Sequence, residues 1–124
     1  MEKTVVIQTG DIIIKMLMKN TPLAEKIYNT LPLTARTRIW GKEIYFEIPV
    51  TSKLENAVNE VNKGDVAYWN EGRCLCLFFG PTPISKGEKP IPASTVEVVG
   101  EMVSDYAKLE TISSEETITI KKEP

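Results

Sequence analysis

The stretch Gly64 to Ser85, GDVAYWNEGRCLCLFFGPTPIS, most constrains what this chain can fold into. A short apolar run at 66–69 leads into Asn70-Glu71-Gly72, a turn whose glycine can adopt a positive φ. The strand 73–79 is then apolar on both faces, because apolar residues occupy every position from Cys74 to Phe79, so both faces of that strand must be covered. Gly80-Pro81-Thr82-Pro83 ends the strand, because proline cannot donate a backbone hydrogen bond to a neighbour. The stretch predicts a central hairpin in a closed or nearly closed sheet.

Length and composition predict a single globular domain over residues 1–124. A chain of 124 residues can bury roughly two thirds of its unfolded surface, and 42% hydrophobic residues is close to the usual globular fraction. The net charge of −2 and the lack of a basic block argue against nucleic acid or an anionic membrane as partner. No apolar run approaches the ~20 residues of a spanning helix, and the N-terminus lacks a signal peptide's apolar region. We therefore expect a cytoplasmic protein.

The chain contains no histidine, which excludes Ser-His-Asp and Cys-His catalysis and any imidazole metal ligand. Its two cysteines, Cys74 and Cys76, lie two positions apart and point the same way on a strand. That spacing does not favour a disulfide, and two thiols do not complete a zinc site. We expect packed, reduced thiols, with neither a metal nor another cofactor.

Hydrophobic periodicity predicts eight strands and two short helices. The expected strands cover residues 4–8, 12–18, 33–40, 43–48, 66–69, 73–79, 94–102 (with a bulge at Gly100) and 117–121. One helix begins at the N-cap Thr21 and ends at Pro32, and a second runs from the capping box Ser52–Glu55 to Gly64. A proline-rich surface loop covers 81–92. This order favours a mainly β fold, a closed eight-stranded antiparallel barrel with a helix over each open end.

The hairpin 33–48 has a register that its turn specifies. With Gly41-Lys42 as a two-residue loop, one face pairs Trp40 with Glu43, Arg38 with Tyr45, and Arg36 with Glu47. The other face pairs Ile39 with Ile44, Thr37 with Phe46, and Ala35 with Ile48. The second face is mostly apolar, so it is expected to face the core.

The polar and aromatic face of this hairpin is the candidate site. Trp40 and Tyr45 would offer apolar platforms, and Arg38 would hydrogen-bond a carbonyl or carboxylate. The alternative is a solvated sheet face with an Arg36–Glu47 ion pair worth ~0.5 kcal/mol. The candidate ligand-binding residues are Arg38, Trp40, Glu43 and Tyr45, with Phe79 and Thr82 as the far wall.

Two other kinds of chemistry are disfavoured. Glu43 and Glu47 share a strand face, as paired carboxylates of a hydrolase would, but nothing in the sequence raises the pKa of either. The segment 80–83 is no phosphate-binding loop, because it lacks the backbone donors and the lysine of that motif.

Three motifs resemble a family of short prokaryotic cyclophilin-like proteins of uncharacterised function. They are Trp40-Gly41-x-Glu43-Ile44-Tyr45-Phe46, Gly64-Asp65-Val66-x-Tyr68-Trp69 and Phe78-Phe79-Gly80-Pro81-Thr82-Pro83, and the resemblance covers nearly the whole chain. It implies a cyclophilin-like barrel. In cyclophilins the peptide groove lies outside the barrel, and an arginine there assists rotation about an Xaa-Pro bond. The counterpart here would be Arg38, or else Arg36. The Phe-Met-x-Gln-Gly-Gly segment of the isomerase groove has no counterpart.

Two functional hypotheses follow. The first is a binding module that holds a small molecule or an extended proline-containing peptide on the outer barrel face. The second is a weak peptidyl-prolyl isomerase in which Arg38 stabilises the twisted amide. Isomerisation has a barrier of ~20 kcal/mol but needs neither a nucleophile nor a metal, so the missing histidine does not exclude it.

Overall fold

The computed structural model describes residues 3–124. These residues form ten strands and two short helical segments, joined by turns and loops. The strands are β1 (Lys3–Thr9), β2 (Ile12–Met18), β3 (Leu33–Arg36), β4 (Arg38–Trp40), β5 (Glu43–Glu47), β6 (Ala57–Val58), β7 (Asp65–Trp69), β8 (Cys74–Phe78), β9 (Val96–Met102) and β10 (Thr117–Lys122). The α-helix α1 spans Pro22–Tyr28, and the 3-10 helix η1 spans Tyr106–Thr111. The sheet order is β3-β10-β1-β2-β9-β7-β8-β5-β4, and β6 pairs with β9 beside this path.

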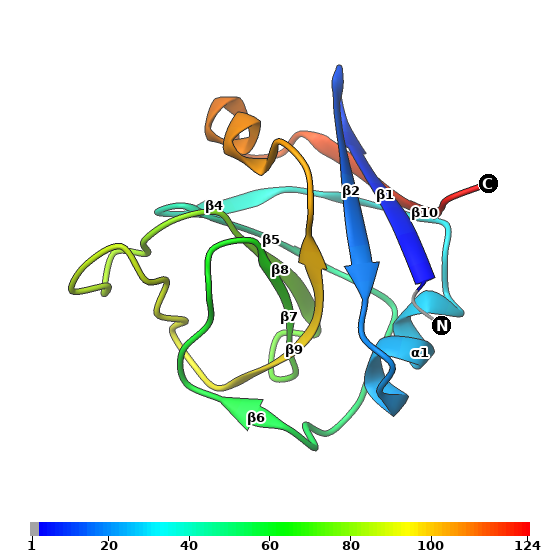
Figure 1. Cartoon of the computed structure of the whole chain (residues 1–124), viewed down its shortest axis with the longest axis horizontal. Helices are drawn as coiled ribbons and strands as arrows, with labels where there is room; N and C mark the ends of the chain where they lie inside the picture. Colours follow the sequence, from blue (N-terminus) through cyan, green and yellow to red (C-terminus); the bar gives the residue numbers. More distant parts are fainter. Residues whose placement is uncertain (1–2) are drawn as a thin grey trace.

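The sheet curls into a nearly closed antiparallel barrel (Figure 1), and the chain itself bridges the seam. The edge strands β3 and β4 are consecutive, separated by Thr37 alone. Thr37 is fully buried; its Oγ1 donates to the Ser113 carbonyl at 2.7 Å and accepts from the Glu116 N–H at 2.9 Å. These bonds hold the bend where the chain leaves one edge of the sheet for the other.

Strand β8 lies between β7 and β5 and is buried on both faces, as the sequence predicts. Leu75 and Leu77 point into the main core inside the barrel. Cys74, Cys76 and Phe78 point outward into a second, smaller apolar cluster. The barrel wall is therefore covered from outside at this position, which creates the setting for the site described below.

The predicted hairpins are confirmed at β1–β2 and β7–β8, and so is the register next to the β4–β5 turn. Arg38 lies opposite Tyr45, Ile39 opposite Ile44, and Trp40 opposite Glu43. Ile44, Phe46, Cys76 and Leu77 are buried as expected, whereas Ile39 is only half-buried. The Thr21 cap is also confirmed, since its Oγ1 accepts from the Ala24 N–H at 3.2 Å. The bulge predicted at Gly100 is present, with Val99 as the extra residue.

The single strand predicted over 33–40 is wrong. It breaks at Thr37, and β3 pairs with β10 instead of extending the β4–β5 hairpin. The Arg36–Glu47 pair therefore does not form. Arg36 donates from Nη1 to the Glu115 carbonyl at 3.0 Å, and Glu47 pairs with Arg73 at 2.7 Å.

The prediction of a second helix over residues 52–64 is also wrong. The only regular secondary structure that this segment forms is the short strand β6. The Ser52 hydroxyl donates to the Lys53 carbonyl instead of capping a helix. The buried Glu97 carboxylate accepts the N–H groups of Glu55 and Asn56 at 2.8 and 3.1 Å, which fixes the segment against β9. These tertiary hydrogen bonds stabilise the non-helical segment more than helix formation would, because a short isolated helix is only marginally stable. The break at Thr37 and strand β6 explain why ten strands form where eight were expected.

Neither helical segment formed by residues 3–124 has the length and apolar character needed to cross a membrane.

Candidate functional site

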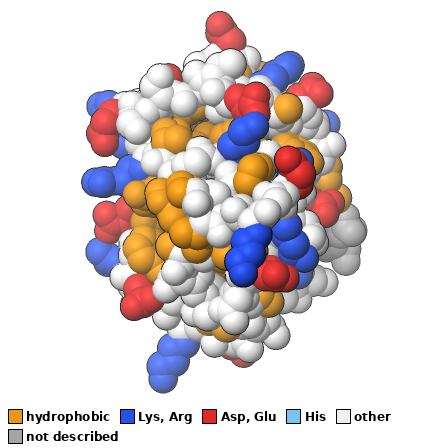
Figure 2. All heavy atoms as spheres, turned by 90° about the vertical axis from the view of Figure 1, so that its left-hand side faces the viewer, with side chains coloured by type: hydrophobic (Ala, Val, Ile, Leu, Met, Phe, Trp, Pro, Cys, Tyr) orange, Lys and Arg blue, Asp and Glu red, His pale blue; other side chains and the backbone are white. Residues whose placement is uncertain are grey.

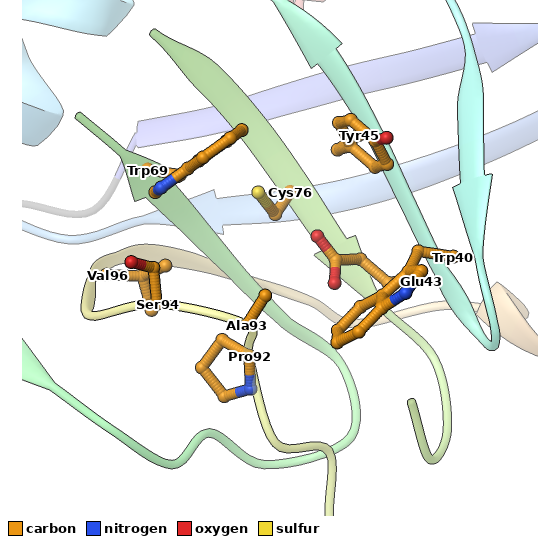
Figure 3. Close-up of a pocket in the computed structure, with 9 residues that line it drawn as sticks. All are labelled: Trp40, Glu43, Tyr45, Trp69, Cys76, Pro92, Ala93, Ser94 and Val96. Atoms are coloured by element: carbon orange, nitrogen blue, oxygen red, sulfur yellow. The ribbon is translucent and has the colours of Figure 1, made fainter. Parts of the chain in front are cut away.

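A pocket of about 160 Å³ lies on the outside of the barrel, between the β5–β8–β7 face and the segment that leads into β9. It is lined by Trp40, Glu43, Tyr45, Trp69, Cys76, Pro92, Ala93, Ser94 and Val96. In Figure 3, Trp69 and Trp40 stand on opposite sides, with Cys76 and the Glu43 carboxyl group between them. Figure 2 faces the side of the molecule that carries the 81–92 loop, and it shows a continuous hydrophobic patch with charged side chains around it.

Strand pairing brings the wall residues together. Tyr45 on β5 lies opposite Cys76 on β8, which in turn lies opposite Ala67 on β7. Trp69 follows Ala67 by two residues, so it emerges on the same outer face. The small Ala67 side chain separates the larger side chains on this face.

Trp69 is positioned by packing against the β7–β8 turn. A Cβ added at Gly72 would lie 2.3 Å from Cζ3 of Trp69, so only glycine allows the ring to rest there. The buried indole N–H of Trp69 finds no acceptor among residues 3–124. Its orientation therefore depends on van der Waals contact with the turn.

The opposite wall is the end of the 81–92 loop, and Thr82 fastens that loop. Its Oγ1 donates to the Ile91 carbonyl at 2.5 Å, and its N–H donates to Ser85 Oγ at 2.9 Å. The same Ser85 oxygen accepts the Ile91 N–H at 3.1 Å. These bonds close the base of the loop, so Pro92 and its neighbours are held across from the sheet.

Glu43 is a buried carboxyl group at the pocket, with 6% of its surface exposed. Burial raises its pKa to about 7, and a hydrogen bond from the Cys76 thiol offsets part of the rise. Of the ion pairs formed within residues 3–124, none includes Glu43. The expectation that nothing raises this pKa is wrong, because the sequence did not reveal the cover over this face.

Glu47 is exposed and paired with Arg73, so the environments of Glu43 and Glu47 differ. The two carboxyl groups do not form the paired site that the shared strand face suggested. Cys74 and Cys76 are buried free thiols, and burial raises the pKa of both, which lowers their nucleophilicity. Within the described chain, no group of three or more Cys, Asp or Glu side chains is arranged to hold a metal ion.

The structure brings three of the six candidate residues together in the pocket: Trp40, Glu43 and Tyr45. Arg38 is exposed and in register with Tyr45, so it lies beside the pocket without lining it. Phe79 was expected in the far wall, but it packs in the core inside the barrel. Thr82 supports the loop behind the wall and does not line the pocket.

Sequence reasoning missed Trp69, Cys76 and the 92–94 segment as lining residues. The alternation of Trp69 with Tyr68 and of Cys76 with Leu77 could have placed the Trp69 and Cys76 side chains on an outer face. Placing that face beside Trp40 requires the β7-β8-β5 strand order, which depends on contacts between distant segments.

A nearly closed antiparallel barrel with a pocket on its outer wall defines a small β-barrel domain. Residues 2–121 match the profile of the Cyclophilin-like family, and the chain belongs to that family. It is also similar to a hypothetical protein of Archaeoglobus fulgidus with a solution structure, at 34% identity and a TM-score of 0.84. That alignment covers 98% of this chain and 95% of the archaeal chain. The search of curated proteins found no match.

Proposed function

We propose that this cyclophilin-like domain is a binding module whose ligand, a small molecule or an extended proline-containing peptide, occupies the outer-face pocket. The observation that carries the proposal is an apolar pocket of about 160 Å³ walled by Trp40, Tyr45 and Trp69. A cavity of roughly 150 Å³ accepts a benzene-sized molecule. The pocket therefore suits one ring, such as a proline ring or a small heterocycle.

Arg38 extends the proposed site for longer ligands. Its exposed guanidinium lies beside Tyr45, and it forms no ion pair within residues 3–124. A peptide that leaves the pocket toward β4 would place a carbonyl within reach of this group. Arg38 would then donate a charge-assisted hydrogen bond.

The test uses intrinsic fluorescence, because the chain has two tryptophans and both line the pocket. N-acetylprolinamide, phenol and a short Ala-Pro peptide are titrated separately. At least one should change the emission saturably, and Trp40→Ala should weaken its binding. Ile13→Ala, at an exposed position on β2, is the matched control and should not. If no probe acts, or Trp40→Ala binds the active probe normally, the proposal is wrong.

A weak isomerase activity is the second candidate, favoured by the exposed Arg38 guanidinium beside the pocket. A protease-coupled assay on Xaa-Pro peptides separates it from binding alone. An isomerase would lose turnover in Arg38→Ala while retaining peptide binding through the pocket. A module that only binds would show no turnover above the uncatalysed rate in either form.

A further inference from the structure

The pocket contains the buried Glu43 carboxyl group, which forms no ion pair with any cation among residues 3–124. None of the nine residues that line the pocket is Lys or Arg. The titratable side chains among them, Glu43, Tyr45 and Cys76, can only be neutral or negative. Burying a carboxylate without a partner is costly. A positively charged ligand would relieve that cost in the bound state.

Within residues 3–124, neither Trp40 nor Trp69 makes a cation–π contact with a side chain of the protein itself. In the part of the chain described, the two cation–π contacts are those of Lys3 and Lys122 with Tyr28, far from the pocket in the sheet order. Figure 3 shows Trp69 nearly edge-on, so one face of its ring is turned toward the space beside Cys76 and Glu43. Trp40 closes the other side of that space.

We propose that the pocket takes an organic cation, an alkylated ammonium group held between Trp40 and Trp69 with its charge opposite the Glu43 carboxylate. This inference rests on the proposed function, because it names the ligand class of the same pocket. Tryptophan faces attract cations, and the attraction is stronger where water is excluded.

The lining favours an alkylated ammonium over a primary one. A primary ammonium carries three N–H donors, each of which needs an acceptor when buried. The pocket offers few oxygen acceptors, chiefly Glu43, and most of its walls are apolar. A quaternary ammonium needs no hydrogen bond, and its methyl groups suit the indole rings and Pro92. A volume of about 160 Å³ accommodates one such head group.

The experiment compares choline with 3,3-dimethyl-1-butanol, its neutral analogue with carbon in place of nitrogen, by tryptophan fluorescence at pH 8. We expect choline to bind at least tenfold more tightly. Glu43→Gln, which keeps the shape and removes the charge, should reduce that preference severalfold, with the remainder coming from the tryptophan faces. Glu47→Gln is the matched control, because Glu47 is on the same strand but exposed and paired with Arg73.

The outcomes separate this inference from the proposed function. Equal binding of choline and the neutral analogue would overturn the cation inference and leave the pocket as a ligand site. No binding of choline also overturns the cation inference. Whether the pocket binds any ligand is then decided by the titrations with N-acetylprolinamide, phenol and the Ala-Pro peptide alone. A further arm uses N-acetyl-trimethyllysine amide. Tighter binding of this compound than of choline would assign the cation to a peptide side chain, and the reverse to a free small molecule.

Discussion

Glu43 is the residue whose environment most affects both stability and binding. Its carboxyl pKa rises from 4.5 to about 7 on folding, so the folded state favours the protonated form. The resulting stabilisation is fully present below pH 4.5 and is lost as the pH rises through 7. At ~1.4 kcal/mol per pKa unit, the ionised carboxylate costs the fold about 3 kcal/mol at pH 8 relative to acid pH.

Glu43→Gln should remove this dependence. Relative to wild type, we expect the variant to gain up to ~3 kcal/mol in free energy of unfolding between pH 4 and pH 8. Urea denaturation at pH 4, 6 and 8 measures the change. Glu47→Gln should follow the wild-type curve, since Glu47 is exposed. Parallel curves for wild type and Glu43→Gln would show that the Glu43 carboxyl does not titrate near pH 7.

Choline affinity should also depend on the ionisation of Glu43. The neighbouring titratable and charged groups are Cys74 and Cys76 on β8, Tyr45 on β5 and Arg38 on β4. Both thiols have raised pKa values and stay neutral between pH 6 and 8, so the carboxyl group is the one that changes. We expect affinity to fall about tenfold per pH unit below 7 and to level off above it. A flat titration series from pH 5 to 8 would contradict this.

Gly72→Ala tests how Trp69 is held. The new methyl group would collide with the indole ring, whose Cζ3 lies 2.3 Å from the added atom. The ring must move, with an overpacking cost of about 1–3 kcal/mol. The variant should show a shifted tryptophan emission and weaker binding of the ring probes. Unchanged emission and affinity would mean that the turn does not position Trp69.

At the scale of elements, local signals predicted what local contacts determine. The two-residue turn at Gly41-Lys42 was sufficient for the Trp40–Glu43 and Arg38–Tyr45 pairs. The break at Thr37 could not be predicted, because it depends on the pairing of β3 with β10. The paired residues of these two strands are more than 80 positions apart in the sequence. The helix predicted at 52–64 failed for a similar reason, since Glu97 on β9 binds that segment.

Thr37→Val tests the role of the break between β3 and β4. The variant keeps the shape of the side chain but loses the bonds to Ser113 and Glu116. We expect a loss of about 2 kcal/mol in the free energy of unfolding, measured in urea. Thr34→Val, on the exposed face of β3, should cost less than ~0.5 kcal/mol. Equal effects of the two substitutions would show that the Thr37 hydroxyl does not hold the seam.

For the whole molecule, the barrel class was predictable because hairpins dominate the chain and β8 is apolar on both faces. Three of the nine lining residues were predictable for the same reason, since Trp40, Glu43 and Tyr45 belong to one hairpin. The other six depend on how β7 and β8 lie against that hairpin, and on the segment that leads from the 81–92 loop into β9. The burial of Glu43 is a consequence of that assembly and has no local signal.

The most direct test of the outer-face site is a series of ¹H–¹⁵N spectra of the wild-type domain. N-acetylprolinamide, phenol and choline are added separately, and the indole N–H signals of Trp40 and Trp69 are followed. For at least one probe, both indole signals should shift saturably with one affinity, while the amide of Ile13 on β2 stays in place. If no probe moves either indole signal, or the shifts centre elsewhere on the barrel, the pocket is not the binding site.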